Sequence, residues 1–160
     1  MEVMFTPWRY EYVKTVDQQE GCIFCDKPSD PESKDEENLI LVRKERCFVI
    51  LNLYPYSSAH LMVVPYEHTG TIEDLDAETM GEMMALTQQC MRAIREAYTP
   101  DGFNVGINIS RVAGAGIDGH VHLHLVPRWD GDSNFMPVVA GVRVLPLALD
   151  SVWRTLKDLL

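Results

Sequence analysis

The sequence lacks any apolar run approaching the roughly 20 residues that a membrane-spanning helix needs. Its start, Met1 to Thr6, also lacks the basic segment and long apolar stretch of a signal peptide. We therefore expect a cytoplasmic protein with no membrane partner. Basic residues are scarce: the chain has 14 Lys and Arg but 24 Asp and Glu, which gives a net charge of −10. This balance argues against nucleic acid as a partner but not against a small nucleotide, whose phosphates a few N–H donors can hold.

Cysteines are also few, and only Cys22 and Cys25 lie close together, as Cys22-Ile-Phe-Cys25. Without an export signal, such a pair favours a metal site or a redox pair over a structural disulfide. Cys47 and Cys90 lie in apolar segments and are expected to be buried core residues. No internal repeat or linker divides the chain. We expect one domain over residues 1–160, with a knuckle at 20–27 and a tail at 127–160.

The pattern of apolar residues predicts an α+β domain with a mostly antiparallel, five-stranded sheet. One long helix is expected from an N-cap at Asp76 to Tyr98, with its methionines in the core, and a short helix near the C-terminus. The composition of residues 28–38 predicts a polar loop without a packing role. Strands are expected at residues 39–42, 47–51, 60–65, 103–109 and 120–127, and the short helix at 149–159.

Three of the five histidines alternate with apolar residues, as His120, His122 and His124. In a strand, residues two apart point to the same face, so the three imidazoles are expected to form a row. Neutral imidazole is nucleophilic near neutral pH, and a neighbouring ring can donate to a phosphoryl oxygen. The glycine-rich loop before the row, at 113–119, offers backbone N–H groups to the same anion. A solvated histidine-rich face and a three-histidine zinc site are the competing interpretations.

The histidine row matches the His-x-His-x-His-x-x signature of the histidine-triad (HIT) superfamily, and the similarity extends along most of the chain. The block from Asn52 to Pro65 resembles the family's segment in which an Asn and a His eight residues apart face the nucleotide. Segments 6–12 and 127–135 resemble the branch of bacterial diadenosine tetraphosphate phosphorylases, which is related to the fragile-histidine-triad hydrolases. The resemblance implies the HIT fold, a homodimer, and cleavage of dinucleoside polyphosphates. A divalent cation such as magnesium could bind together with the substrate.

The resemblance also implies a role for each matching residue. His122 would attack the α-phosphorus and become nucleotidylated, His124 would assist the leaving group, and His60 would lie near the phosphate or support the triad. Many relatives carry Ser or Thr just before the triad, whereas this chain has Gly116-Ile-Asp-Gly119, so backbone N–H groups would serve there alone. The residues expected to bind substrate are Asn52 at the ribose, Asn108 and Gly116 at the phosphate, and Phe48 and Ile50 at the base.

Several bacterial relatives bind zinc through an N-terminal C-x-x-C, a later His and the first triad histidine. The corresponding residues here are Cys22, Cys25, His68 and His120. Two thiolates and two imidazoles make a closed tetrahedral set, so the expected zinc is structural. Reduced thiols without a ligand and a surface His68 are the alternative.

Other functions remain open from the sequence. A nucleoside phosphoramidate hydrolase would use the same nucleophile, and Trp129, Arg143 and Trp153 in the tail argue against it, since they would build a second nucleotide subsite. A nucleotide sensor with weak catalysis would not need an intact nucleophile. A zinc-stapled interaction domain would leave the histidine row unexplained. The sequence leaves two acceptors open for the nucleotidyl group, namely water, which would make a hydrolase, and inorganic phosphate, which would make a phosphorylase.

Overall fold

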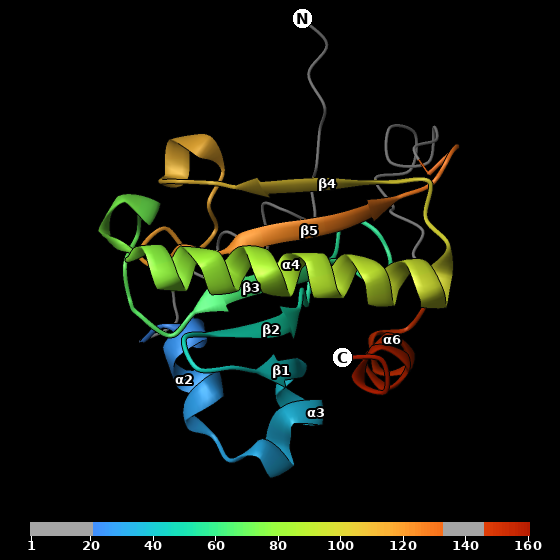
Figure 1. Cartoon of the computed structure of the whole chain (residues 1–160), viewed down its shortest axis with the longest axis horizontal. Coiled ribbons are helices and arrows are strands. Elements are labelled where there is room, and N and C mark those ends of the chain that lie inside the picture. Colours follow the sequence, from blue (N-terminus) through green and yellow to red (C-terminus); the bar gives the residue numbers. More distant parts are fainter. Residues whose placement is uncertain (1–20, 133–145) are drawn as a thin grey trace, which may run out of the picture.

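The computed structural model describes residues 21–132 and 146–160 of the chain. Its centre is one five-stranded antiparallel sheet in the order β1-β2-β3-β5-β4, crossed on one face by the long helix α4 (Figure 1). The α+β class and the five-stranded sheet predicted from the sequence are confirmed. The strands are β1 (Ile40–Arg43), β2 (Cys47–Leu51), β3 (Leu61–Pro65), β4 (Gly102–Ile107) and β5 (Leu123–Arg128).

Helix α4 (Ala77–Tyr98) begins at the predicted N-cap, where Asp76 Oδ1 accepts a hydrogen bond from the Thr79 N–H at 2.7 Å. One side of the helix carries Met83, Leu86, Cys90 and Ile94 into the larger apolar core, against the inner faces of β2, β3 and β5. The expectation that the helix methionines are core residues is wrong for Met84. That side chain is 48% exposed, because it follows Met83 by about 100° around the helix and points away from the sheet.

A second apolar cluster lies on the opposite face of the sheet, formed by residues that alternate along β2 and β3 with those of the first. Helix α2 (Ile23–Ser29) contributes the buried side chain of Phe24 to this cluster. The remaining buried members are Ile40, Phe48, Ile50, Met62 and Val64. Because both faces of the sheet are covered here, every residue of β2 and β3 is buried.

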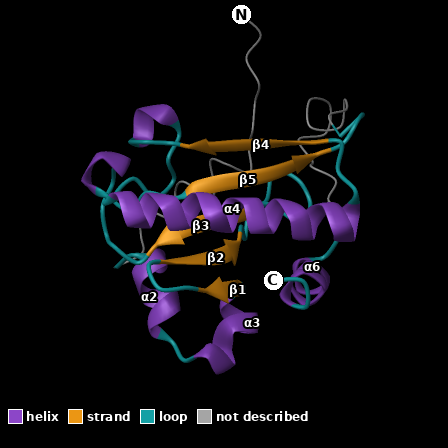
Figure 2. Cartoon of the chain, in the orientation of Figure 1, coloured by secondary structure: helices purple, strands orange, loops and turns teal. Residues whose placement is uncertain are grey.

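The segment predicted as a polar loop without a packing role is instead partly helical and anchored to the sheet. It contains a 3-10 turn (Glu32–Lys34) and α3 (Asp35–Asn38), and α2, α3 and α6 gather around β1 (Figure 2). Asp35 is 6% exposed and its Oδ1 lies 2.8 Å from Arg43 Nη2 of β1. The prediction failed because composition alone does not reveal that Asp35, one of several acidic residues in the segment, is buried against a cationic partner.

Helix α6 (Leu149–Lys157) packs against the outer edge of the sheet at β1. Trp153 Nε1 donates to the Ile40 carbonyl at 2.9 Å, and Lys157 Nζ donates to the Leu41 carbonyl at 2.7 Å. These contacts cover backbone groups that an edge strand would otherwise expose. Among the described residues, no helix has the length and apolar character required to cross a membrane.

Candidate active site and metal centre

His122 is held in a defined orientation immediately before β5. Its Nδ1 lies 2.8 Å from the carbonyl oxygen of His120, so Nδ1 carries the proton and donates it. The other nitrogen, Nε2, therefore bears a lone pair. Burial lowers the pKa of His122, which is 4% exposed, although the bond to the His120 carbonyl acts in the opposite direction. A neutral imidazole with an unprotonated Nε2 is a nucleophile at neutral pH.

A chain of hydrogen bonds fixes the tautomers of His60 and His124. The Tyr56 backbone N–H donates to His60 Nδ1 at 3.1 Å, so the ring proton of His60 is on Nε2. His60 Nε2 lies 3.0 Å from His124 Nδ1 and donates to it, which places the proton of His124 on Nε2. The rings of His122 and His124 are 4.8 Å apart between centroids. A nucleophile and a hydrogen-bond donor thus stand side by side, and the donor can stabilise the negative charge that develops when a phosphoanhydride bond breaks.

The histidine row is not a regular strand, contrary to the expectation for residues 120–127. Strand β5 begins at Leu123, so only His124 lies within it. The Val121 N–H donates to the Thr69 carbonyl and the His120 carbonyl accepts from the His122 side chain, so both leave the ladder. As a result His120 turns toward a different group of side chains, while His122 and His124 stay adjacent.

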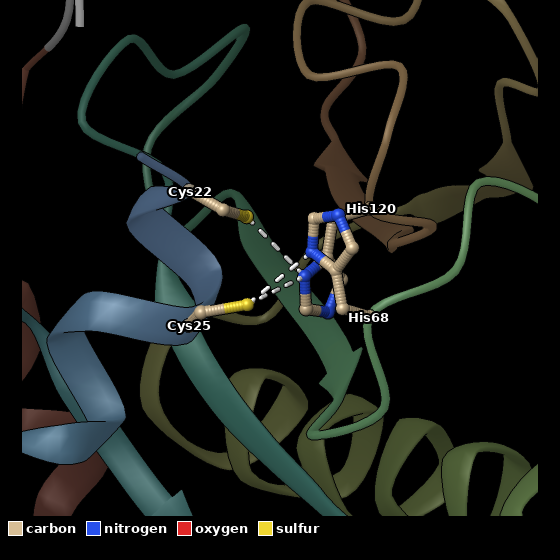
Figure 3. A group of neighbouring side chains, drawn as sticks. All are labelled: Cys22, Cys25, His68 and His120. Carbon is tan, nitrogen blue, oxygen red and sulfur yellow. Dashed lines mark hydrogen bonds between the residues drawn. The ribbon is translucent and has the colours of Figure 1, made fainter. Parts of the chain in front are cut away.

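The ring of His120 faces the two cysteines of the C-x-x-C and His68, as the sequence predicted for these four residues (Figure 3). Cys22 Sγ and His120 Nδ1 are 3.3 Å apart, as are Cys25 Sγ and His68 Nδ1. One potential ligand atom from each residue lies within 4.8 Å of all the others. The Cys/His group could therefore hold a metal ion.

The chemistry of this donor set fits zinc. Metal–ligand bonds of 2.0 to 2.3 Å in a tetrahedron place neighbouring ligand atoms about 3.3–3.8 Å apart, and the contacts of Cys22 and Cys25 with the two Nδ1 atoms are of that size. His120 Nε2 lies 2.9 Å from the Pro65 carbonyl oxygen and donates to it, which leaves a lone pair on Nδ1 toward the thiols. Metal-binding histidines commonly have such a partner on the second ring nitrogen.

Two loops that are distant in sequence are held together to form this group. The bond from Val121 N–H to the Thr69 carbonyl joins the loop of His68 to that of His120. Next to it, a Cβ on Gly70 would lie 2.7 Å from the carbonyl oxygen of Asp118, closer than real Cβ contacts. Only glycine allows the loops to approach so closely. No motif in the sequence signalled this requirement.

Comparison with known proteins agrees with this geometry. The HIT domain family matches residues 33–131 of the chain. The chain belongs to the HIT family. It is 37% identical over 161 residues to a protein named AP-4-A phosphorylase from Mycobacterium tuberculosis (strain CDC 1551 / Oshkosh), covering 98% of this chain and 83% of that protein.

Solved HIT structures share the fold. A Zn-bound histidine triad family protein from Mycobacterium smegmatis matches with a TM-score of 0.61 and 25% identity, covering 93% of this chain and 91% of that one. A hypothetical histidine triad nucleotide-binding protein from Sulfolobus tokodaii strain7 matches with a TM-score of 0.66 and 24% identity, over 86% of this chain and 91% of that one. The second likeness concerns the fold alone.

The residues predicted to bind substrate in this HIT chain fall into two groups. Asn52 is half-buried beside His60, and its Oδ1 accepts the Tyr54 N–H at 2.9 Å. Asn108 follows the end of β4, and Gly116 lies in the loop before the histidines; both are half-buried. By contrast, Phe48 and Ile50 are 0% and 2% exposed beneath α2, so in this conformation they present no open surface to a base.

The second nucleotide subsite expected from the tail is not assembled by its tryptophans. Trp153 packs against the core on the α4 side of the sheet, whereas His124 lies on the opposite side. Trp129 Nε1 donates to the Tyr98 carbonyl at the end of α4. Both side chains are thus engaged in holding helices to the sheet. The third residue of that prediction, Arg143, lies outside the described residues.

Two aromatic residues that the sequence analysis did not assign to the site touch its histidines. The ring of Tyr56 stacks on His60, with centroids 5.2 Å apart and planes at 19°. The ring of Phe24 lies 4.9 Å from that of His122 and 5.5 Å from that of His120. Phe24 is one of the two residues between the cysteines of the knuckle. That position could have suggested a role beside the metal site, but an apolar residue there is equally typical of a core.

Proposed function

We propose that this HIT protein cleaves dinucleoside polyphosphates, such as diadenosine tetraphosphate, through a covalent nucleotidyl-His122. The observation that carries the proposal is the bond from His122 Nδ1 to the His120 carbonyl, because it leaves Nε2 unprotonated beside His124, which donates a hydrogen bond from its Nε2–H. The name of the Mycobacterium tuberculosis relative supports the choice of substrate class. Catalytic roles for His122, His124 and His60 are part of this proposal.

In the first step, the Nε2 lone pair of His122 forms a bond to the α-phosphorus. The phosphorus–oxygen bond to the leaving polyphosphate breaks, and that oxygen departs as an anion with the electron pair while it accepts a hydrogen bond from His124 Nε2–H. His60 Nε2–H stabilises the lone pair on His124 Nδ1 throughout, which keeps the donor in its correct tautomer. Asn52 would bind the ribose, and Asn108 with the backbone at Gly116 would bind the phosphate oxygens.

In the second step, an acceptor attacks the phosphorus, and the phosphorus–nitrogen bond returns its electrons to His122 Nε2. Inorganic phosphate attacks through an anionic oxygen, whereas water releases its proton to the solvent, and in both cases His122 Nε2 regains its lone pair. Water as the acceptor gives a hydrolase, and inorganic phosphate gives a phosphorylase. We favour phosphate, because the relative that covers 98% of this chain is named a phosphorylase.

We also propose that the Cys/His group binds zinc and that the chain is one domain acting as a homodimer. The zinc-bound relative from Mycobacterium smegmatis supports the metal, which would cross-link the knuckle to the active-site loop without an open position for catalysis. The edge strand β4 and the outer side of α4 support the dimer. In the described chain β4 has a strand partner on one side only, and Val105 and Met84 nearby are 44% and 48% exposed.

The deciding experiment is to incubate the zinc-loaded protein with diadenosine tetraphosphate and to identify products by chromatography, with and without inorganic phosphate. We expect ATP and ADP when phosphate is present, and His122→Ala is expected to abolish turnover. Isolation of the wild-type protein carrying a labelled, acid-labile nucleotidyl group would identify the intermediate directly.

The remaining outcomes separate the alternatives. Release of AMP and ATP without phosphate would make the protein a hydrolase with the same nucleophile. Turnover of a nucleoside phosphoramidate, but not of the dinucleotide, would reject the proposed substrate. Equal inactivity of the wild type and His122→Ala on both substrates would reject the enzyme and favour a nucleotide sensor.

A further inference from the structure

We propose that Phe24 is a positioning residue that transmits the rigidity of the metal-binding turn to the ring of His122. The inference rests on the proposed function, since His122 is the nucleophile only if that function holds. It concerns an apolar side chain that forms no part of the donor set and touches no reacting atom. Three observations lead to it, concerning the ring contacts, the placement of Phe24 in the knuckle, and its burial.

The first observation is the contact between the rings. The ring of Phe24 lies 4.9 Å from that of His122, with the planes tilted by 48°, and at 5.5 Å and 70° from that of His120. Aromatic rings attract one another at such separations, and the angle between them is restricted. The hydrogen bond at Nδ1 fixes one point of the His122 ring, and rotation about that point is limited by what packs against the rest of the ring. Phe24 supplies such a contact.

The second observation is where Phe24 sits in the chain. Cys22 is the N-cap of α2, and the Cys25 and Asp26 N–H groups both bond to the Cys22 carbonyl at 2.9 Å. The two thiols that face the histidines therefore belong to the first turn of α2, and Phe24 lies within that turn. When a metal ion ties both thiols to His68 and His120, the backbone on each side of Phe24 is held.

The third observation is that Phe24 is buried, so its side chain cannot move away from His122 into solvent when the turn shifts. It is 1% exposed and packs in the cluster that includes Ile40 and Met62. Interiors are close-packed, so a shift of the turn displaces the ring into its neighbours rather than into empty space. One neighbour is His122. A displacement of about 1 Å at a reacting group can reduce the rate by up to about a hundredfold.

A matched pair of variants tests the proposal. Phe24→Leu removes the ring but keeps an apolar side chain, and Ile40→Val makes a deletion of similar size in the same cluster. Ile40 belongs to β1, which β2 and β3 separate from β5, so it serves as the packing control. Both variants would be studied loaded with zinc, with the bound metal measured by atomic emission.

For Phe24→Leu we expect single-turnover formation of nucleotidyl-His122 to slow by about tenfold to a hundredfold, with KM and metal content close to wild type. Ile40→Val should change the rate less than about twofold. Removing the metal with a chelator should slow the wild type by a similar factor but slow Phe24→Leu little further, since coupled effects are not additive. If chelation slowed Phe24→Leu by the same factor as it slows the wild type, the two losses would be additive. The metal would then act on His122 only through the His120 backbone, and the proposal would be overturned.

A readout that does not depend on catalysis separates this proposal from the function it rests on. Nuclear magnetic resonance of the histidine ring protons reports the ring current of Phe24 at His122. We expect the His122 signals to shift when zinc is removed from the wild type, and to respond much less in Phe24→Leu. An unchanged His122 signal on zinc removal would reject the proposal even if the enzyme is active. A shift in a protein without turnover would retain the coupling and reject the function.

Discussion

At the scale of single residues, the site depends on which ring nitrogen carries a proton. The backbone N–H of Tyr56 sets the tautomer of His60, and the backbone carbonyl of His120 sets that of His122. His60 in turn sets the tautomer of His124, because it donates to His124 Nδ1. The sequence predicted which histidines would meet, because their alternation and the distance from Asn52 to His60 match a known family. It could not predict the proton positions, because these depend on main-chain groups whose placement no side-chain pattern encodes.

The cysteines differ in reactivity at the same scale. Burial raises the pKa of Cys47 and of Cys90 to about 12, so neither forms a thiolate near neutral pH. Cys22 and Cys25 are only half-buried and face the metal-binding histidines. At about pH 8, we expect iodoacetamide to modify none of the four thiols in the zinc-loaded protein and only Cys22 and Cys25 after chelation. Mass spectrometry of the native protein measures this.

Unfolded protein provides the control, since all four thiols should then react. Modification of Cys22 and Cys25 at equal rates before and after chelation would argue against a metal at the knuckle. Modification of Cys47 or Cys90 in the native protein would contradict their burial.

At the scale of elements, the sequence predicted those whose pattern is regular. Strand β2 matches its predicted range, and α4 begins after its predicted cap because Asp76 bonds to the Thr79 N–H. Strand β1 starts one residue later than predicted, since Leu39 adopts a left-handed conformation with φ of 63° as the cap of α3. The failures lie where one partner outside the segment decides its structure, as Arg43 does for Asp35 and Thr69 for Val121.

The ion pair between Asp35 and Arg43 joins α3 to β1, and its loss should destabilise the protein. The side chains of Asp35 and Arg43 are 8% and 17% exposed, and Arg43 also donates to the Pro28 and Asp30 carbonyls, which keeps it in place. Asp35→Ala leaves that guanidinium without its charge partner. We expect the free energy of unfolding to fall by about 2–4 kcal/mol, measured by urea denaturation of the zinc-loaded protein.

A nearby exposed pair offers the matched control. Lys34 and Asp30 are 49% and 38% exposed, so Lys34→Ala should change the free energy of unfolding by no more than about 0.5 kcal/mol. Equal effects of the two substitutions would show that burial does not strengthen the Asp35 pair.

At the scale of the whole molecule, the two edges of the sheet are treated differently. Edge strand β1 is covered by α6, through Trp153 and Lys157, whereas in the described residues β4 carries no such cover. An open edge beside exposed apolar side chains attracts another chain. The proposed dimer would cover both features at once, because a two-fold axis beside β4 would pair the two edges and bring the Met84 side of each α4 together.

The dimer can be tested by placing a charge on this face. Val105→Glu puts a carboxylate on β4, where two copies would bring like charges together at the axis, so we expect it to shift the protein from dimer to monomer. Analytical ultracentrifugation at several concentrations measures the shift. Leu159→Glu is the control, because Leu159 is 36% exposed just after α6, at the other edge of the sheet, and the same change in net charge there should leave the dimer intact. A wild-type protein that sediments as a monomer at every concentration would reject the dimer, and dissociation by both variants would assign the effect to net charge rather than to the β4 edge.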